Sequence, residues 1–463
     1  MKRRAPQSAQ KPHARPARAQ IEQPVAIEKP VEIEKPIYGG AFLARAEGKA
    51  VFVPLALPGE QARLRITQEK RGYSTAEIEE IVSAAPGRIA PACRHFGACG
   101  GCTYQHANYA AQLAFKQAIL RETLERGGVR APEEIRTLSA DPWHYRNRIR
   151  LAFDAHGNAG YRGRRSHAII PIAECPIAAP LLVEAAQAVT GLARQFAPAL
   201  RPTELSLFCN ADETALLATI FTTGTASTRF EEFAQTLAAR IPALAGAELA
   251  VEGRAGEPPR TLVTWGATSL VYRAAGFDYR VDHGAFFQVN RWLANALVDA
   301  VLEPVTMHQP GALAWDLFAG VGLFARRLTT SFDRVVAVES APAATAALAH
   351  NLSATTATAV HADTRTFLRR NLHGARPDLV VPDLIVPDLI VMDPPRTGLG
   401  TEVCSMLAEI AAPALVYVSC DPATLARDLR ALIASGYTVQ SVTLADLFPQ
   451  TFHLETVVHL RQS

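Results

Sequence analysis

The sequence lacks the features that direct a chain into a membrane or out of the cell. No apolar run approaches the roughly 18 residues that a membrane-spanning helix needs, so we expect no membrane span. The N-terminus has no apolar segment of the signal-peptide type, and its serines are too scarce for a typical transit peptide. These absences predict a protein of the cytoplasm.

Acidic residues are missing from residues 1–20, which carry six cations. The formal net charge is +3 for the whole chain, so the rest of it is slightly acidic. Such a basic block is typical of a solvated tail, and it can also act as a non-specific arm for nucleic acid. We predict a basic disordered tail over residues 1–29, and the Ile-Glu-Lys-Pro-like units at 27–30 and 33–36 are typical of a linker.

The pattern of strands and turns predicts three domains after the tail, in a multi-domain α/β chain. Residues 30–88 contain short alternating strands separated by glycine-rich turns, which is typical of a small OB-like β-barrel. Residues 89–285 mix strands and helices and predict a central α+β domain. Residues 286–463 alternate strand and helix, which predicts a doubly wound, Rossmann-like parallel sheet.

One segment of the last domain is repeated. The unit Pro-Asp-Leu-Val-Val at 377–381 returns with small changes at 382–386 and 387–391. Only one copy is needed as the strand before Asp393, so we expect the others to lie in a surface loop.

Polar and glycine residues follow several predicted strands of the last domain. Phe318 and Gly320 lie in the turn Asp-Leu-Phe-Ala-Gly-Val-Gly (316–322), where glycine lets a ligand approach the backbone closely. Glu339 ends the second strand and is placed to accept ribose hydroxyls, and Asp363 after the third strand would meet an adenine edge. Together with Asp393-Pro394-Pro395 after the fourth strand, this pattern predicts a site for S-adenosyl-L-methionine.

A cysteine and a glutamate provide the candidate chemistry. Cys420 ends an apolar run, 414–420, and a helix is predicted to begin after it, so the helix N-terminus would lower the pKa of the thiol. A carboxyl group on a nearby loop would supply the proton acceptor that a covalent nucleophile needs. These residues predict an enzyme.

At these motifs the chain resembles the RNA uracil-5-methyltransferase family. The resemblance rests on Asp-Pro-Pro-Arg-x-Gly at 393–398, Tyr-x-Ser-Cys at 417–420 with Thr424, and Asp-x-Phe-Pro-x-Thr-x-His-Leu-Glu at 446–455. The Tyr-Gly-Gly at 38–40 in the barrel resembles a TRAM domain, an RNA-binding module. One residue departs from the family, which usually has Asn where Asp421 stands, and an extra carboxylate there is expected to raise the pKa of the thiol.

The resemblance implies a covalent mechanism. Addition of the Cys420 thiolate to C6 of uracil makes C5 nucleophilic enough to take a methyl group from S-adenosyl-L-methionine. Glu455 then removes the proton from C5, and the cysteine is eliminated. The resemblance also implies that Asp393 holds the base or the cofactor and that Gln288 contacts the cofactor.

Three of the seven cysteines are closely spaced, in the pattern Cys93-x5-Cys99-x2-Cys102, and Cys175 lies downstream. Without a secretory signal, this favours metal binding or catalysis over disulfides. Four thiolates suit either a structural Zn²⁺ or an iron–sulfur cluster, and the spacing alone leaves both open. The family resemblance implies a [4Fe–4S] cluster with a structural or RNA-sensing role. Cys209 and Cys404 have no such motif or further cysteine near them in the sequence, so they are expected in the core.

Arginines and aromatic residues alternate between residues 143 and 165. Arginine binds phosphates and aromatic rings stack on splayed bases, so this segment predicts contact with single-stranded RNA. It contains Arg146, Arg148, Arg150, Arg162, Arg164, Arg165, Trp143, Tyr145, Phe153 and Tyr161.

A TRAM domain combined with four cysteines resembles the branch of the family that acts on 23S rRNA, so we expect that substrate and a monomer. The alternatives are the same reaction on tRNA and a non-catalytic RNA-binding module. Amino-group methylation is a further class, because Asp-Pro-Pro resembles its motif. Arg396 argues against it, since that class has an aromatic residue there and needs no cysteine nucleophile.

Overall fold

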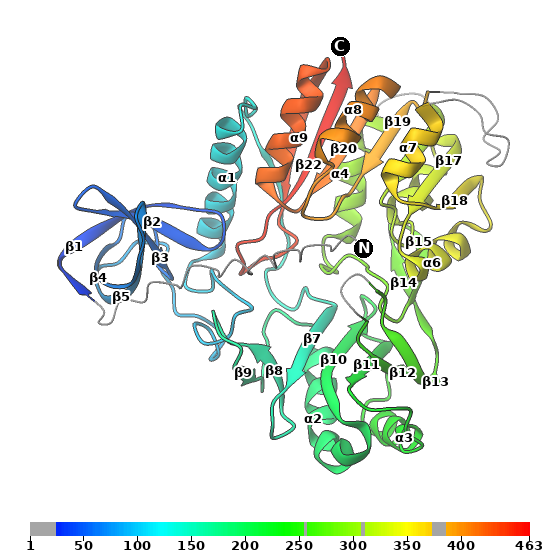
Figure 1. The fold of residues 1–463 in the computed structure, drawn as a ribbon, viewed down its shortest axis with the longest axis horizontal. Coiled ribbons are helices and arrows are strands. Elements are labelled where there is room, and N and C mark those ends of the chain that lie inside the picture. Colours follow the sequence, from blue (N-terminus) through cyan, green and yellow to red (C-terminus); the bar gives the residue numbers. More distant parts are fainter. Residues whose placement is uncertain (1–24, 254–256, 307–310, 373–385) are drawn as a thin grey trace, which may run out of the picture. The chain divides into compact units, whose positions relative to one another are not determined.

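The computed structural model describes residues 25–253, 257–306, 311–372 and 386–463, which form two compact units (Figure 1). The smaller unit ends at Pro86 and excludes Tyr38–Gly40, which belong to the larger unit. The basic arm at residues 1–20 lies outside the described residues, as do the first copy of the Pro-Asp-Leu repeat and nearly all of the second. Along the described part of the chain, no helix is both long and apolar enough to cross a membrane.

The smaller unit is a closed β-barrel, as the strand and turn pattern predicted. Apolar side chains such as Phe42, Val53 and Leu64 fill its interior. Its strands lie in the order β1-β2-β3-β5-β4. They are β1 (Val25–Pro36), β2 (Ala41–Ala46), β3 (Lys49–Pro54), β4 (Gln61–Glu69) and β5 (Tyr73–Ser83).

The Ile-Glu-Lys-Pro-like units do not form a linker, and this prediction was wrong. They lie in β1, which pairs with β2 and β4. Val31 and Ile33 are buried whereas Glu32 and Glu34 are exposed, so the segment has the two-residue alternation of a half-buried strand. The barrel therefore begins at Val25, before the predicted boundary at residue 30.

The C-terminal part of the larger unit contains the predicted doubly wound sheet. Its strands lie in the order β18-β17-β16-β19-β20-β22-β21-β6, and β22 alone among them runs antiparallel to its neighbours. The strands are β6 (Arg136–Leu138), β16 (Gly311–Leu317), β17 (Phe332–Glu339), β18 (Ala357–His361), β19 (Leu389–Met392), β20 (Ala414–Ser419), β21 (Tyr437–Ala445) and β22 (Glu455–Gln462). Helix α4 (Ala294–Thr306) precedes β16, and the helices between the later strands are α5 (Leu323–Leu328), α6 (Pro342–Leu352), α7 (Thr364–Leu372), α8 (Gly400–Ile410) and α9 (Pro422–Ala434).

Both faces of this sheet are buried, as a parallel sheet requires. Val335 and Ala337 of β17 belong to one apolar cluster, and the alternate residues Val336 and Val338 belong to another. The carboxyl ends of the parallel strands meet at one edge, where the predicted functional residues stand.

The structure divides the larger unit differently from the predicted boundary at residue 285. Helix α1 (Tyr109–Arg126) and strand β6 precede the central sheet in sequence, yet they belong to the methyltransferase-like core. Strand β6 pairs with β21, and Leu120 of α1 shares an apolar cluster with Leu425 and Leu429 of α9. The hairpin of β14 (Ser269–Ala274) and β15 (Phe277–Asp282) packs into the same core from the other face.

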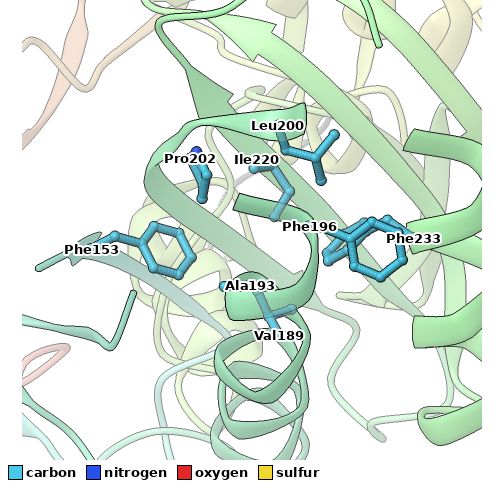
Figure 2. Close-up of a pocket in the computed structure, with 8 residues that line it drawn as sticks. All are labelled: Phe153, Val189, Ala193, Phe196, Leu200, Pro202, Ile220 and Phe233. Atoms are coloured by element: carbon cyan, nitrogen blue, oxygen red, sulfur yellow. The ribbon is translucent and has the colours of Figure 1, made fainter. Parts of the chain in front are cut away.

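The middle of the larger unit is a second sheet, with strand order β13-β12-β11-β10-β7-β8-β9. Helices α2 (Pro180–Leu200) and α3 (Phe230–Arg240) pack against it (Figure 1). A small gap between them is lined only by apolar side chains such as Phe196 and Phe233, so no polar group would orient a ligand there (Figure 2). The strands are β7 (Arg148–Phe153), β8 (Ala159–Arg162), β9 (Ile169–Pro171), β10 (Pro202–Cys209), β11 (Leu216–Thr222), β12 (Leu244–Val251) and β13 (Arg260–Gly266).

Candidate active site

Cys420 stands between β20 and α9, as the sequence predicted. The helix begins at Pro422, a favoured first residue because proline has no N–H to leave unpaired. Asp421 caps it: its Oδ1 accepts the N–H groups of Ala423 and Thr424 at 3.0 and 2.9 Å. The cap fixes the turn that carries the thiol.

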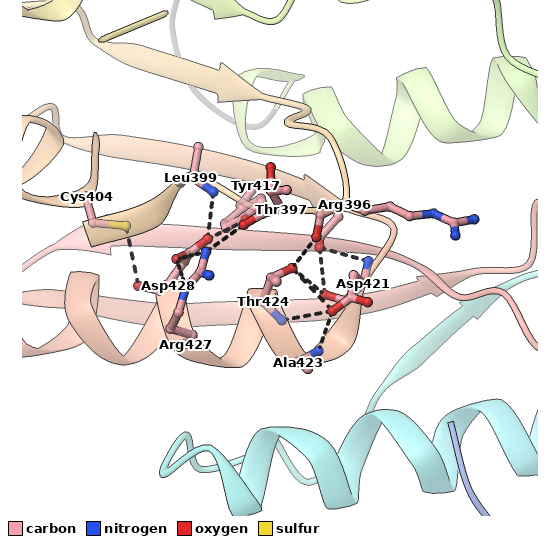
Figure 3. Close-up of polar contacts among 11 residues, drawn as sticks. Arg396, Thr397, Leu399, Cys404, Tyr417, Asp421, Ala423, Thr424, Arg427 and Asp428 are labelled. Atoms are coloured by element: carbon pink, nitrogen blue, oxygen red, sulfur yellow. Dashed lines mark hydrogen bonds and ion pairs between the residues drawn. The ribbon is translucent and has the colours of Figure 1, made fainter. Parts of the chain in front are cut away.

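The loop after β19, which contains Arg396, is held by one face of α9 (Figure 3). Thr424, Arg427 and Asp428 make hydrogen bonds of 2.7–3.1 Å to backbone groups of residues 396–399. Gly398 has φ +70, and a Cβ there would lie 2.4 Å from the Asp428 carboxylate, so only glycine fits. The nucleophile turn and the Asp-Pro-Pro-Arg loop are therefore built as one unit.

Glu455 is the first residue of β22 and is buried, with 6% of its surface exposed. It pairs with Ala445, the last residue of β21, so a loop of residues 446–454 closes the hairpin directly before it. Because β22 lies beside β20, the hairpin brings the carboxyl group close to the thiol of Cys420, and Glu455 raises the pKa of that thiol.

The pKa of the Cys420 thiol is raised to about 11. Burial is the main cause, the carboxyl groups of Glu455 and Asp393 add to it, and Arg396 opposes it. The predicted lowering by the helix N-terminus was wrong: in the free protein these effects outweigh it, and Asp421 already occupies the first N–H groups of the helix.

The two carboxyl groups beside the thiol both have raised pKa values. Burial raises the pKa of Asp393 to about 7. Burial also raises the pKa of Glu455 well above its usual value, Asp393 raises it further, and Arg396 lowers it. Glu455 thus has the environment of a strong general base rather than of a solvent-exposed carboxylate.

Tyr38 is a residue of this site that the sequence analysis used only as a mark of the barrel. Its hydroxyl donates to the backbone oxygen of Cys420 at 3.4 Å, and its ring lies edge-on against Phe452 with centroids 5.6 Å apart. The Asp421 carboxylate lies close enough to raise the pKa of Tyr38, after burial. Tyr38 therefore contacts both the nucleophile turn and the loop before Glu455.

The predicted cofactor residues meet at the carboxyl edge of β16 and β17. Both Phe318 and Gly320 have left-handed backbone conformations, with φ +67 and +56. The N–H of Gly320 donates to Glu339 at 2.9 Å, so the carboxylate shapes the glycine turn. Buried Asp316 accepts the N–H of Ala325 at 2.8 Å, and its pKa is raised to about 8, chiefly by burial.

Two further residues predicted to bind the cofactor have structural contacts of their own. The Asp363 carboxylate is exposed. It caps α7 by accepting hydrogen bonds from the N–H and the hydroxyl of Thr366. Gln288 is buried, and its backbone oxygen accepts from the Asn147 amide at 2.8 Å. Their roles toward a cofactor stay predictions.

The four clustered cysteines line one cavity. Burial raises the pKa of Cys102 to about 12 and also raises those of Cys99 and Cys175. Arg146 lines the same cavity. Among the described residues, no group of three or more His, Cys, Asp or Glu side chains has the geometry to hold a metal ion. Cys209 and Cys404 are buried in the core, as predicted.

The arginine-rich segment does not face solvent throughout, which corrects part of the RNA-binding prediction. Arg148 donates to the backbone oxygen of Ala285 and covers the Phe208 ring, and burial lowers its pKa to about 10. Arg146 and Tyr161 line the cysteine cavity, and Tyr145 is fully buried. Alternation along strand β7 turns Ile149 and Leu151 inward and leaves Arg148 and Arg150 on the other face, so the cover of Arg148 comes from Phe208 and Ala285 and not from the strand pattern. The remaining arginines, Arg150, Arg162, Arg164 and Arg165, line an open surface groove.

Comparison with known proteins gives a consistent result. The family model described as tRNA (Uracil-5-)-methyltransferase matches residues 108–463, and the TRAM domain model matches residues 25–78. The 23S rRNA (uracil(1939)-C(5))-methyltransferase RlmD of Halomonas elongata is 31% identical over 439 residues, which cover 91% of this chain and 87% of that protein. The protein of the same name from Klebsiella pneumoniae is 32% identical over 429 residues, which cover 90% and 92%.

A solved structure has a similar fold. Pyrococcus abyssi tRNA (uracil-54, C5)-methyltransferase, in complex with S-adenosyl-L-homocysteine, has a TM-score of 0.71 and 22% identity, and the match covers 93% of this chain and 99% of that one. With a family model that spans more than half of the chain and relatives that align with nine-tenths of it, the chain belongs to the RNA uracil-5-methyltransferase family and carries a TRAM domain.

Proposed function

We propose that this chain transfers the methyl group of S-adenosyl-L-methionine to C5 of a specific uridine in 23S rRNA, giving 5-methyluridine. The observation that carries the proposal is the pairing of Ser419 in β20 with Thr456 in β22, which brings Cys420 beside Glu455, together with the influence of Glu455 and Asp393 on the thiol pKa. The names of relatives that match nine-tenths of the chain support 23S rRNA over the tRNA alternative.

In the first step the Cys420 thiol loses its proton and Sγ bonds to C6 of the uracil, which leaves the ring as an enolate with a nucleophilic C5. The charged forms of Glu455 and Asp393 oppose ionisation of the thiol. When the Asp393 carboxylate takes up the thiol proton, this opposition weakens and Glu455 stays free for the second step. Arg396 favours the thiolate as well.

In the second step C5 takes a methyl group and then loses its proton. S-adenosyl-L-methionine, when bound, would supply that group in electrophilic form on a sulfonium and would leave as the neutral thioether S-adenosyl-L-homocysteine when the methyl–sulfur bond breaks. Glu455 removes the C5 proton, the C5–C6 double bond forms again, and the C6–Sγ bond breaks to release Cys420 as a thiolate. The raised pKa of Glu455 makes it a stronger base for this transfer. The cofactor would be held by Phe318, Gly320, Glu339, Asp363, Asp393 and Gln288.

The cysteine cavity fits a [4Fe–4S] cluster held by Cys93, Cys99, Cys102 and Cys175. The donor set is four thiols, and a cluster of this type takes four thiolates. Four thiolates would also suit a single Zn²⁺, and the choice of a [4Fe–4S] cluster rests on the family resemblance. Such a cluster would tie the loop of residues 93–102 to residue 175 in the middle of the unit.

RNA would also contact the central sheet. Arg165 is exposed beside the groove that Arg150 and Arg162 line, and phosphate binding by such arginines is the common basis of affinity for RNA. Glu204 already pairs with Arg150 and Arg162, so Arg165 is the arginine whose replacement tests this surface most directly.

The proposal is tested by methyl transfer from labelled S-adenosyl-L-methionine to unmodified 23S rRNA and to bulk unmodified tRNA, with protein prepared without oxygen. We expect label in 23S rRNA as 5-methyluridine. Label only in tRNA would show that the assignment of 23S rRNA as the substrate is wrong. No label in either RNA would favour a non-catalytic RNA-binding module. A Glu455→Gln variant should retain RNA in a complex that resists denaturation, because the cysteine cannot be eliminated.

A further inference from the structure

Helix α1 contacts the loop before Glu455 through one line of polar side chains. Tyr109, Gln112 and Lys116 are three and four residues apart, so they lie on one face of the helix. The sequence motifs gave none of them a role. The loop that they contact, residues 446–454, joins β21 to β22 and ends at the proposed base.

The first contact is an ion pair without solvent exposure. Lys116 Nζ lies 2.5 Å from Asp446 Oδ1, and both side chains are completely buried. The same ammonium group donates to the backbone oxygen of Phe448 at 2.9 Å. The hydroxyl of Tyr109 donates to the other oxygen of Asp446 at 2.9 Å, so both carboxylate oxygens have a partner on α1.

The second contact holds a residue in an unfavourable backbone conformation. Gln450 has φ +67, a left-handed conformation that non-glycine residues rarely adopt. The Gln112 amide accepts the N–H of Gln450 and donates to its side-chain oxygen, both at 2.9 Å. The N–H groups of Thr103 and Tyr104 donate to the backbone oxygen of Gln450 at 2.9 and 3.0 Å.

The neighbouring carbonyl groups of the loop are engaged as well. The Tyr145 hydroxyl donates to the backbone oxygen of Pro449 at 3.1 Å, and the Asn290 amide donates to that of Leu447 at 3.2 Å. Every backbone oxygen from residue 447 to residue 450 therefore accepts a hydrogen bond from outside the hairpin. A turn that only connects two strands does not need this, whereas a loop that must place a catalytic carboxyl group does.

We propose that Tyr109, Gln112 and Lys116 are positioning residues that set Glu455 for proton removal from C5 through the strained loop of residues 446–450. This inference rests on the proposed function. It predicts that loosening the loop slows the base step and elimination more than it slows formation of the Cys420–C6 bond, because the thiol is on a different element.

Two glutamines of the same helix give a matched test. Gln112→Met removes the contacts to Gln450, whereas Gln117→Met removes hydrogen bonds to Ile135 and Thr137, neither of which is a residue of the loop. With 23S rRNA and labelled S-adenosyl-L-methionine, we expect Gln112→Met to release 5-methyluridine about 10-fold to 100-fold more slowly than the wild type. We also expect methyl label to accumulate in a protein–RNA complex that resists denaturation. Gln117→Met should match the wild type in that fraction.

The outcomes separate the two proposals. If the wild type forms no 5-methyluridine, the proposed function fails. If the wild type is active and Gln112→Met holds no more RNA than Gln117→Met, the positioning role is wrong. If Gln112→Met does not fold, Tyr109→Phe, which loses only the hydroxyl that donates to Asp446, decides by the same comparison.

Discussion

Cys420 and Cys102, one of the cysteines of the cavity, both have a raised thiol pKa in the free protein, and their neighbours make the difference. Burial raises the pKa of Cys420 to about 11 and that of Cys102 to about 12. Cys420 has two carboxyl groups beside it that can take and return a proton, whereas Cys102 has further thiols and Arg146. A raised thiol pKa therefore does not separate a nucleophile from a ligand, but the presence of a proton acceptor does.

Of the two kinds of thiol, Cys420 should show the larger loss of methyl transfer when it is replaced. We expect Cys420→Ala to reduce methyl transfer by about 10⁴-fold or more, because no other group can activate C5. Cys404→Ala is the control, since the Cys404 pKa is also raised to about 12 but its thiol lies in the core. It should lower stability and leave the rate per folded molecule unchanged. Full activity of Cys420→Ala, measured with labelled cofactor, would refute the covalent mechanism.

Replacing a cysteine of the cavity should change the metal content of the protein and not the formation of the Cys420–C6 bond. We expect Cys102→Ser to lose iron and acid-labile sulfide, from about four of each per chain to near zero. Cys209→Ala, at a buried cysteine outside the cavity, should keep both. Iron and sulfide are measured on protein prepared without oxygen. Retention of the full amount by Cys102→Ser would show that this residue is not a ligand.

The pH dependence of methyl transfer should reflect the raised pKa of the Cys420 thiol. Both the thiolate of Cys420 and the carboxylate of Glu455 must be ionised to act, and both pKa values are raised, so activity should fall as the pH falls. We expect kcat/KM to increase by about tenfold or more for each unit between pH 6 and pH 7, because ionisation of the thiol alone gives tenfold and that of Glu455 adds to it, and to keep rising at pH 8. A profile that is flat from pH 6 to pH 8 would contradict the raised pKa of the thiol.

A smaller effect is expected at Tyr38. Tyr38→Phe removes the hydroxyl that donates to the Cys420 backbone, so the thiol turn loses one support and we expect kcat to fall about threefold to tenfold. Tyr437→Phe is matched, because its buried hydroxyl donates to the backbone oxygen of Ala412 at the opposite end of β20. Equal rates of RNA methylation for the two variants would leave Tyr38 without a role at the nucleophile.

Local signals explain what the sequence could predict. The change from β20 to α9 was predicted because an apolar run ends at Cys420 and a capping Asp421 and Pro422 follow it. The glycine turn after β16 and the acid after β17 follow from the same short-range pattern. These features depend on residues that are close together in the chain.

The features that were missed depend on contacts between distant residues. No local pattern shows that β6 pairs with β21, about 300 residues later in the chain. The pKa of Cys420 was predicted in the wrong direction because burial, and after it Glu455 and Asp393, raise the pKa, and these neighbours reach the thiol only through the sheet order. The segment of β1 was predicted to be a linker because its prolines and charged residues are a stronger local signal than the alternation of Val31 and Ile33.

The place of α1 and β6 in the methyltransferase core has a consequence for the newly made chain. Leu120 and Leu124 emerge from the ribosome long before Leu425 and Leu429, their partners on α9. At about 5–20 residues per second, these apolar side chains wait roughly 15–60 s for the rest of their core. During this interval the buried face of α1 is open to chaperones and to aggregation. A fragment that begins at residue 286 would lack that helix altogether, so the catalytic part of this enzyme should not fold in isolation.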